Sequence, residues 1–212
     1  MMGGNGFLLA VITSPGEIPG EGEYMEGMLE AGLERLHLRK PRGSGERPRG
    51  SGEGLRGAAE GLQGSVEGLL ERLAPRWASR LVVHGSAELA ARYGVEKVHR
   101  VNSTSVHSWE ELRALPPGMD YAFISPVFDS ISKPGYRAAA DLLEIPAGPL
   151  PCRPVGLGGV SRDTIGLMLT RGWTGAAVLG WIWEKPREAV SRFEQLKKII
   201  HGQANGVGGS GL

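Results

Sequence analysis

Short apolar runs alternate with amphipathic segments along most of the chain. Continuous apolar runs are typical of parallel strands buried on both faces, and a 3.6-residue period is typical of the helices that cover them. The pattern predicts strands at residues 7–12, 35–39, 81–83, 95–101, 103–107, 121–127, 155–157 and 175–179. It predicts helices at residues 24–31, 55–73, 87–93, 109–115, 136–143, 164–171 and 186–200, with Pro75 stopping the second of them.

Strands and helices that alternate in this way predict a parallel sheet with right-handed crossovers. Eight such units predict a closed (β/α)₈ TIM barrel, with an open doubly wound sheet as the alternative. One unit departs from the pattern, because almost nothing separates strands 95–101 and 103–107. Parallel neighbours normally need a crossover of about a dozen or more residues. We therefore expect a shortened fourth crossover, made by an irregular connection or by a different local register.

The length of 212 residues fits one domain, which we place at residues 1–201. Much of the excess of glycine and proline lies in residues 42–54, where RGSGE occurs twice, and in the tail at 202–212. Such a Gly/Ser/Arg tract cannot bury enough apolar surface to order itself. We expect a disordered, solvated insertion, with RNA contact as the alternative, and a flexible tail.

Charge and cysteine content limit the classes of function. Lys and Arg total 24 against 23 Asp and Glu, a balance that argues against a dedicated nucleic-acid binder. Cys152 is the single cysteine, so no intramolecular disulfide forms and a reducing compartment is the simpler assumption. No apolar stretch has the span of a membrane helix. We expect a cytoplasmic protein with no membrane or nucleic-acid partner, and the sequence leaves a homo-oligomer open.

Candidate chemistry lies at the C-terminal ends of the strands, where parallel barrels carry their sites. A period of two places His37 and Arg39 on one face of the second strand, which predicts that both point into the barrel. The guanidinium of Arg39 suits phosphate recognition, and Lys40 follows it. For His37 a structural and a substrate-binding role are equally open.

The fifth strand ends in a second polar group. Ser105 and His107 alternate along it, and His107 can exchange protons near neutral pH. Ser108 and Glu111 form the pattern of a capping box at the start of the next helix. The two interpretations are compatible, because Ser108 can cap the helix while His107 faces the pocket.

The loops after the last three strands carry candidate phosphate contacts. Ser130, Ser132 and Lys133 lie in a loop bounded by Gly and Pro, which suits an anion-gripping lid or an ordinary surface loop. Consecutive glycines before a helix let backbone N–H groups approach an anion. Phosphate sites of such barrels are commonly built after strands seven and eight. We therefore expect phosphate contacts at Gly158, Gly159, Leu179 and Gly180.

No metal motif or nucleophile motif stands out in the sequence. None of the five histidines forms a helical pair at ligand spacing. They are His37, His84, His99, His107 and His201.

The strand ends together resemble the thiamin phosphate synthase and TenI (thiazole tautomerase) family. The segments that carry the resemblance are LHLRKP, SVHSWEE, SPVFDSISKPG, VGLGGV and GAAVLG, in family order. The resemblance implies a (β/α)₈ barrel of thiamin biosynthesis that binds a thiazole phosphate.

The departures from the family pattern favour the tautomerase branch. Synthases typically have Gln where His37 stands, Lys where Pro41 stands, and Asn-Asp where His84 and Gly85 stand. A second Mg²⁺-linked Asp belongs to the loop that is shortened here. Tautomerases are similar in having His in the second-strand motif and Gly at the first metal position, and their proposed acid/base histidine matches His107.

The resemblance therefore implies a TenI-type thiazole tautomerase that needs no cofactor. In it, His37, Arg39, Lys40, Ser105, Ser130, Ser132 and Lys133 would bind the substrate. The alternatives are a thiamin phosphate synthase, which would need Mg²⁺ and release pyrophosphate, and a barrel that binds the phosphate ligand without turnover.

Overall fold

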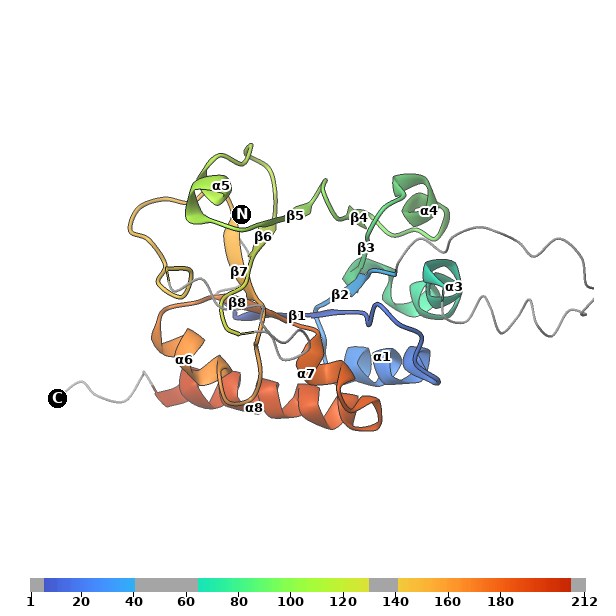
Figure 1. Ribbon diagram of the computed structural model, residues 1–212. Coiled ribbons are helices and arrows are strands. Elements are labelled where there is room, and N and C mark those ends of the chain that lie inside the picture. The colour runs from blue at the N-terminus through green and yellow to red at the C-terminus, as the bar shows by residue number, and fades with distance from the viewer. Residues whose placement is uncertain (1–5, 41–64, 130–140, 207–212) are drawn as a thin grey trace, which may run out of the picture.

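The computed structural model describes residues 6–40, 65–129 and 141–206. Eight strands form one sheet, in which every paired neighbour runs parallel. They are β1 (Leu8–Ile12), β2 (Arg35–Leu38), β3 (Leu81–Val83), β4 (Lys97–Val98), β5 (Ser103–Val106), β6 (Tyr121–Ile124), β7 (Arg153–Leu157) and β8 (Gly175–Val178). Their order is β4-β3-β2-β1-β8-β7-β6-β5, and they curve into a ring with the helices outside it (Figure 1). The predicted (β/α)₈ barrel is confirmed.

The apolar alternation of each strand divides the core into two layers. Leu8, Ala10 and Ile12 of β1 pack inside the barrel with residues such as Tyr121 and Phe123 of β6. The alternate residues of the same strands pack outward against the helices, in a larger cluster. A continuous apolar run such as β1 is therefore buried on both faces, as the sequence pattern predicts.

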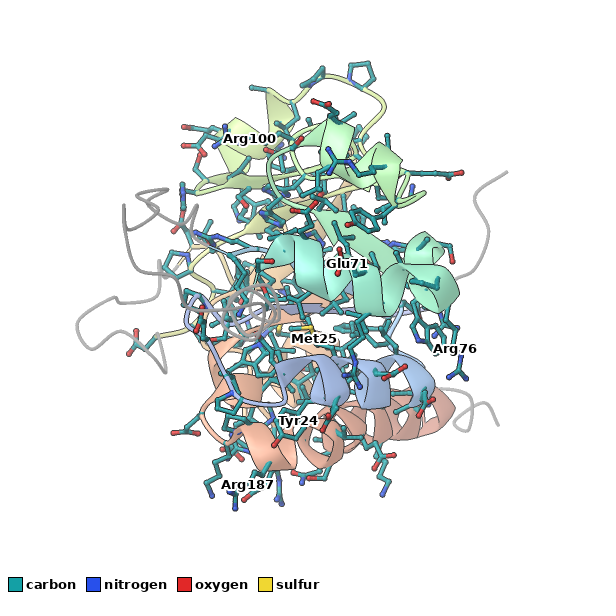
Figure 2. All side chains as sticks on the ribbon, turned by 90° about the vertical axis from the view of Figure 1, so that its right-hand side faces the viewer. Tyr24, Met25, Glu71, Arg76, Arg100 and Arg187 are labelled. Carbon is teal, nitrogen blue, oxygen red and sulfur yellow. The ribbon has the colours of Figure 1, made fainter. Side chains whose placement is uncertain are left out.

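The helices cover the outside of the ring. They are α1 (Glu21–Glu30), α3 (Val66–Trp77), α4 (Ala87–Arg92), α5 (Trp109–Arg113), α6 (Ile165–Thr170), α7 (Gly180–Trp183) and α8 (Ala189–Gly206), with 3₁₀ turns at Ala78–Arg80 and Pro186–Glu188. Figure 2 shows Met25 of α1 pointing into the interior, where it is fully buried. The expectation that Pro75 stops its helix is wrong, since α3 includes Pro75 and continues to Trp77. A proline in the last turn removes one helical hydrogen bond, and the buried Leu69, Leu70 and Leu73 hold the helix on the core.

The fourth crossover is replaced by a four-residue connection from His99 to Asn102. Arg100 adopts a left-handed conformation there, with φ at 76°. The Asn102 side chain accepts a hydrogen bond from the N–H of Val98 at 2.9 Å, and its backbone carbonyl accepts one from Asp120 at 2.9 Å. His99 and Ser103 form a parallel bridge that brings β4 and β5 together. An irregular connection, not a different register, therefore closes this side of the barrel.

Several sequence expectations fall on residues outside the described ranges. These are the insertion at 42–54, residues 55–64 of the predicted second helix, residues 136–140 of another, and the end of the tail. Within the described ranges, no helix is long and apolar enough to span a bilayer.

Candidate functional site

His107 stands at the end of β5 with its ring held in one orientation. Its Nδ1 lies 3.0 Å from the carbonyl oxygen of Ser125, so Nδ1–H donates and Nε2 keeps the lone pair. The backbone N–H of His107 donates to Glu111 Oε2 at 2.7 Å, and Ser108 Oγ caps α5 by accepting from the N–H of Glu111 at 3.1 Å. The predicted N-cap at Ser108 is confirmed, but Glu111 accepts from the residue before the cap, so the reciprocal half of the predicted capping box is not formed. His107 itself is exposed at the mouth of the barrel.

The glycine pair after β7 packs tightly against the loop after β6. Gly158 and Gly159 both have positive φ, at 98° and 62°. A Cβ on Gly159 would lie 2.3 Å from the carbonyl oxygen of Asp129, and one on Gly158 would lie 3.0 Å from Pro126 Cα. The sequence thus uses glycine here both for its backbone conformation and for a close approach of two chain segments.

The backbone at the ends of β7 and β8 offers N–H groups to the mouth. The carbonyl of Gly158 accepts from the N–H of Phe128, which ties the glycine pair to the neighbouring loop. In the described part of the chain, the N–H groups of Gly159 and Gly180 meet no hydrogen-bond acceptor. Leu179 lies between β8 and α7, and its carbonyl accepts the first helical hydrogen bonds, from Ile182 and Trp183.

His37 in β2 and the two residues that follow the strand, Arg39 and Lys40, have three different surroundings. His37 is completely buried inside the barrel, while Arg39 is exposed at the strand end. Lys40 is tied to the β1–α1 segment, because its Nζ lies 2.5 Å from Glu21 Oε2 and 2.8 Å from the carbonyl oxygen of Gly16. Burial raises the pKa of the Glu21 carboxyl, while the Lys40 ammonium acts to lower it.

Three histidines meet inside the barrel at the ends of β2, β3 and β4. His37 Nδ1 lies 2.8 Å from His84 Nε2, and the rings of His84 and His99 stack with centroids 4.0 Å apart. His37 Nε2 lies 2.6 Å from the Tyr121 hydroxyl. His99 Nδ1 lies 3.0 Å from Ser103 Oγ and its Nε2 lies 3.4 Å from Ser105 Oγ. We call His37, His84 and His99 the histidine trio.

The electrostatic surroundings keep the histidine trio neutral. Burial, followed by the charges of the other two histidines and of Arg35, holds the pKa of His37 well below its usual range. Burial also lowers the pKa of His84 to about 3 and that of His99 to about 4, and the charges of Arg39 and Arg100 act in the same direction. Three uncharged imidazoles therefore face one another at neutral pH.

The structure brings at least five of the twelve predicted site residues to one edge of the barrel. They lie at the C-terminal edge: Ser105 near the end of β5 and His107 just after it, Gly158 and Gly159 after β7, and Gly180 after β8. Ser130, Ser132 and Lys133 lie outside the described residues. Sequence reasoning did not single out His84 and His99. The sequence does contain a signal for this cluster, because each of three successive predicted strands has a histidine near its end. Helical ligand spacing relates residues of a single helix, so it does not detect histidines on three different strands.

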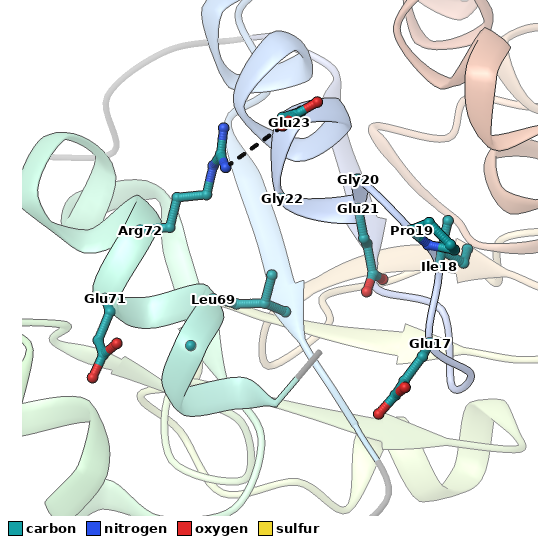
Figure 3. A pocket seen from close by; sticks show the side chains of 11 residues that line it. Glu17, Ile18, Pro19, Gly20, Glu21, Gly22, Glu23, Leu69, Glu71 and Arg72 are labelled. Atoms are coloured by element: carbon teal, nitrogen blue, oxygen red, sulfur yellow. Dashed lines mark ion pairs between the residues drawn. The ribbon is translucent and has the colours of Figure 1, made fainter. Parts of the chain in front are cut away.

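A cavity of about 620 Å³ lies between the start of α1 and the first turns of α3 (Figure 3). Arg72 of α3 borders it and pairs with Glu23, at 4.0 Å, and with Glu26, at 3.0 Å. Glu17, Glu21 and Glu71 contribute further carboxyl groups to its lining. None of the predicted site residues lines this cavity, which lies between two helices and not inside the ring of strands.

The fold and the edge site define a (β/α)₈ barrel, and comparison with solved structures shows which barrels it is similar to. Thiamine phosphate pyrophosphorylase from Bacteroides thetaiotaomicron matches at 23% identity with a TM-score of 0.61, over 90% of this chain and 96% of that chain. The enzyme of the same name from Pyrococcus furiosus matches at 20% identity with a TM-score of 0.59, over 93% and 97%. A 3-hexulose-6-phosphate synthase matches at 12% identity with a TM-score of 0.53, over 91% and 99%. No family model matches the chain. At these identities the likeness shows the shared barrel fold.

Proposed function

We propose that this barrel binds a thiazole phosphate at its C-terminal edge and moves a proton on it, as a thiazole tautomerase of the TenI type does. The observation that carries the proposal is the fixed ring of His107. Its Nδ1–H donates to the Ser125 carbonyl at 3.0 Å, so Nε2 is the basic nitrogen, and the residue is exposed. A side chain placed in this way can take a proton from a bound ring and return it at another position.

The backbone around the glycine pair supports a phosphate contact next to His107. Ser125 accepts the hydrogen bond from His107, and the residue after it packs on Gly158, so the two candidate subsites belong to adjoining loops. The N–H groups of Gly159 and Gly180 meet no acceptor within the described residues and can donate to phosphate oxygens. The exposed guanidinium of Arg39 adds positive charge at the same edge.

The donor groups at the ends of β3 and β4 support a proton transfer rather than pyrophosphate release. The Mg²⁺ that the synthase reaction needs prefers carboxylate and other oxygen ligands. The residues that follow β3 are His84 and Gly85, and those that follow β4 are His99 and Arg100. None of these four residues offers a carboxylate, so the ends of β3 and β4 supply no ligand of the kind that Mg²⁺ prefers. A proton transfer within one molecule expels no pyrophosphate and does not need that ion.

The test is tautomerisation of a thiazole phosphate, followed by proton NMR. We expect turnover by the wild-type chain, a loss of at least about a hundredfold in kcat for His107→Ala, and wild-type kcat for His201→Ala, which removes an exposed histidine on α8. Wild-type activity in His107→Ala would overturn the role of His107.

A second assay separates the alternatives, of which the two pyrophosphorylase neighbours favour the synthase. Pyrimidine pyrophosphate and thiazole phosphate are mixed with the protein, with and without Mg²⁺. Metal-dependent release of pyrophosphate would replace the tautomerase proposal with a synthase. Thermal stabilisation by thiazole phosphate without either reaction would indicate a binding protein.

A further inference from the structure

The histidine trio has the composition of a metal site. One ring nitrogen from each of His37, His84 and His99 lies within 4.8 Å of the other two. The three residues come from the ends of neighbouring parallel strands, so the sheet itself holds them together. The role proposed for His107 uses none of them.

We propose that the histidine trio binds a late transition-metal dication, with Zn²⁺ as the ion that fits best. Imidazole nitrogen is a preferred ligand of Zn²⁺, Cu²⁺ and Ni²⁺, whereas Mg²⁺ and Ca²⁺ prefer oxygen. Three histidines with one remaining position form a known ligand set of zinc sites that keep an open position.

The outer nitrogens of two rings already have partners of the kind that orient metal ligands. His37 Nε2 contacts the Tyr121 hydroxyl at 2.6 Å, and His99 Nδ1 contacts Ser103 Oγ at 3.0 Å. A ligand histidine usually donates its second N–H to such a group, which determines the tautomer and the ring orientation. The nitrogens on the inner side are His37 Nδ1, which faces His84, and His99 Nε2, whose contact with Ser105 Oγ is long at 3.4 Å and would give way to the cation.

The contact between His37 and His84 shows where the cation would enter. At 2.8 Å, one proton must lie between His37 Nδ1 and His84 Nε2. If His84 moves its proton to Nδ1, both facing nitrogens present lone pairs, and a dication can take the place of that hydrogen bond. His84 and His99 are partly exposed, so the cation can approach from the mouth, while His37 forms the floor.

Positive charges near the histidine trio influence which ligand would take the fourth coordination position of the cation. Arg39 lies two residues beyond His37 and Arg100 directly follows His99, both are exposed, and both charges act on His84 and His99. Their positive charge opposes a bare dication and favours one that also carries an anion. We therefore infer that the open position takes an oxyanion, for which inorganic phosphate is the simplest probe.

The test is a Zn²⁺ titration of the full chain by calorimetry, after EDTA treatment and removal of any affinity tag. We expect one equivalent per chain, tighter binding when inorganic phosphate is present, and loss of stoichiometric binding in His84→Ala and in His99→Ala. Tyr121→Phe removes the hydroxyl that contacts His37 Nε2 and Ser103, and is expected to weaken binding by about 10–100-fold. His201→Ala is the matched control and should bind as the wild type does.

A second measurement keeps the outcome independent of variant folding. Wild-type protein loaded with Co²⁺ should show the visible absorption of a tetrahedral nitrogen site, and a crystal should show an anomalous peak among the three rings. Absence of stoichiometric Zn²⁺ binding by the wild type would overturn the proposal and leave the histidine trio as a hydrogen-bonded packing unit. Binding that survives in folded His84→Ala and His99→Ala would place the metal elsewhere and would also overturn it. Neither result changes the His107 assay, so the two proposals can fail separately.

Discussion

The Nζ atom of Lys40 lies 2.5 Å from Oε2 of Glu21, and both side chains are buried. The sequence singles out Lys40 as a ligand for an anionic substrate, because it follows Arg39 at a strand end. The structure shows instead that its charge is matched by a carboxylate of α1, and that the pair joins β2 to the segment before that helix. A buried ion pair of this kind makes each partner dependent on the other.

This dependence predicts a large effect of removing one charge. We expect Lys40→Met to lower the free energy of unfolding by about 3–5 kcal/mol, since it leaves Glu21 buried without a counter-charge. Arg92→Met breaks the exposed pair with Glu67, 3.0 Å long, and should cost at most about 1 kcal/mol. Urea denaturation measures both, and the double variant Glu21→Gln/Lys40→Met should recover part of the loss. Equal costs for the two single variants would show that Lys40 is available to a ligand.

The glycine at 159 is expected to tolerate no side chain. Gly159→Ala requires a non-glycine residue at a φ of 62° and places Cβ 2.3 Å from the Asp129 carbonyl oxygen. The control is Gly172→Ala, which has a φ of 78° with no atom within 4 Å of the added Cβ, and which should cost about 1–2 kcal/mol. We expect Gly159→Ala to cost clearly more in thermal denaturation and to weaken phosphate binding. A cost equal to that of the control would mean that the two loops separate freely.

The neutral histidine trio predicts an acid-sensitive fold. His84 and His99 have folded-state pKa values of about 3 and about 4, below the ordinary 6.5 that they regain on unfolding. The unfolded chain therefore binds more protons between these limits, and stability falls as pH falls from 6.5 toward 4. Each histidine contributes up to about 1.4 kcal/mol per pH unit.

Urea denaturation in EDTA, repeated between pH 7.5 and pH 4.5, measures this slope. The double variant His84→Gln/His99→Gln should show a shallower slope, by up to about two protons. His201→Gln serves as the control and should retain the wild-type slope. An unchanged slope in the double variant would show that other groups cause the acid sensitivity.

The charge of Arg100 is expected to limit metal affinity. Arg100→Asn removes a positive charge that acts on His84 and His99, and asparagine tolerates the φ of 76° at this position. In the absence of phosphate, we expect it to tighten Zn²⁺ binding by about two- to fivefold at low ionic strength. Arg187→Asn is the control, because Arg187 lies at the opposite end of the molecule in Figure 2. Weaker binding in Arg100→Asn would contradict a repulsive role for this charge.

Local pattern was enough to predict the barrel. Both faces of a barrel strand are buried, so β1 and β3 are continuous apolar segments, and such short strand segments alternate with amphipathic helices along the chain. Local chemistry also located the cap of α5 at Ser108, because capping depends on residues three positions apart. Glycines at 158 and 159 predicted special backbone conformations, and both have positive φ.

The partners of the polar side chains were decided by the tertiary structure. Lys40 and Glu21 are 19 residues apart, and His37 and His84 are 47 apart, so no local spacing relates either pair. The curvature of the sheet brings three strand ends to one point inside the ring, and burial there keeps three imidazoles neutral. The sequence by itself determined the elements and their order, because these depend on periodicity. Only the folded barrel decided that His37 faces two other histidines, because that contact depends on how β2, β3 and β4 lie side by side.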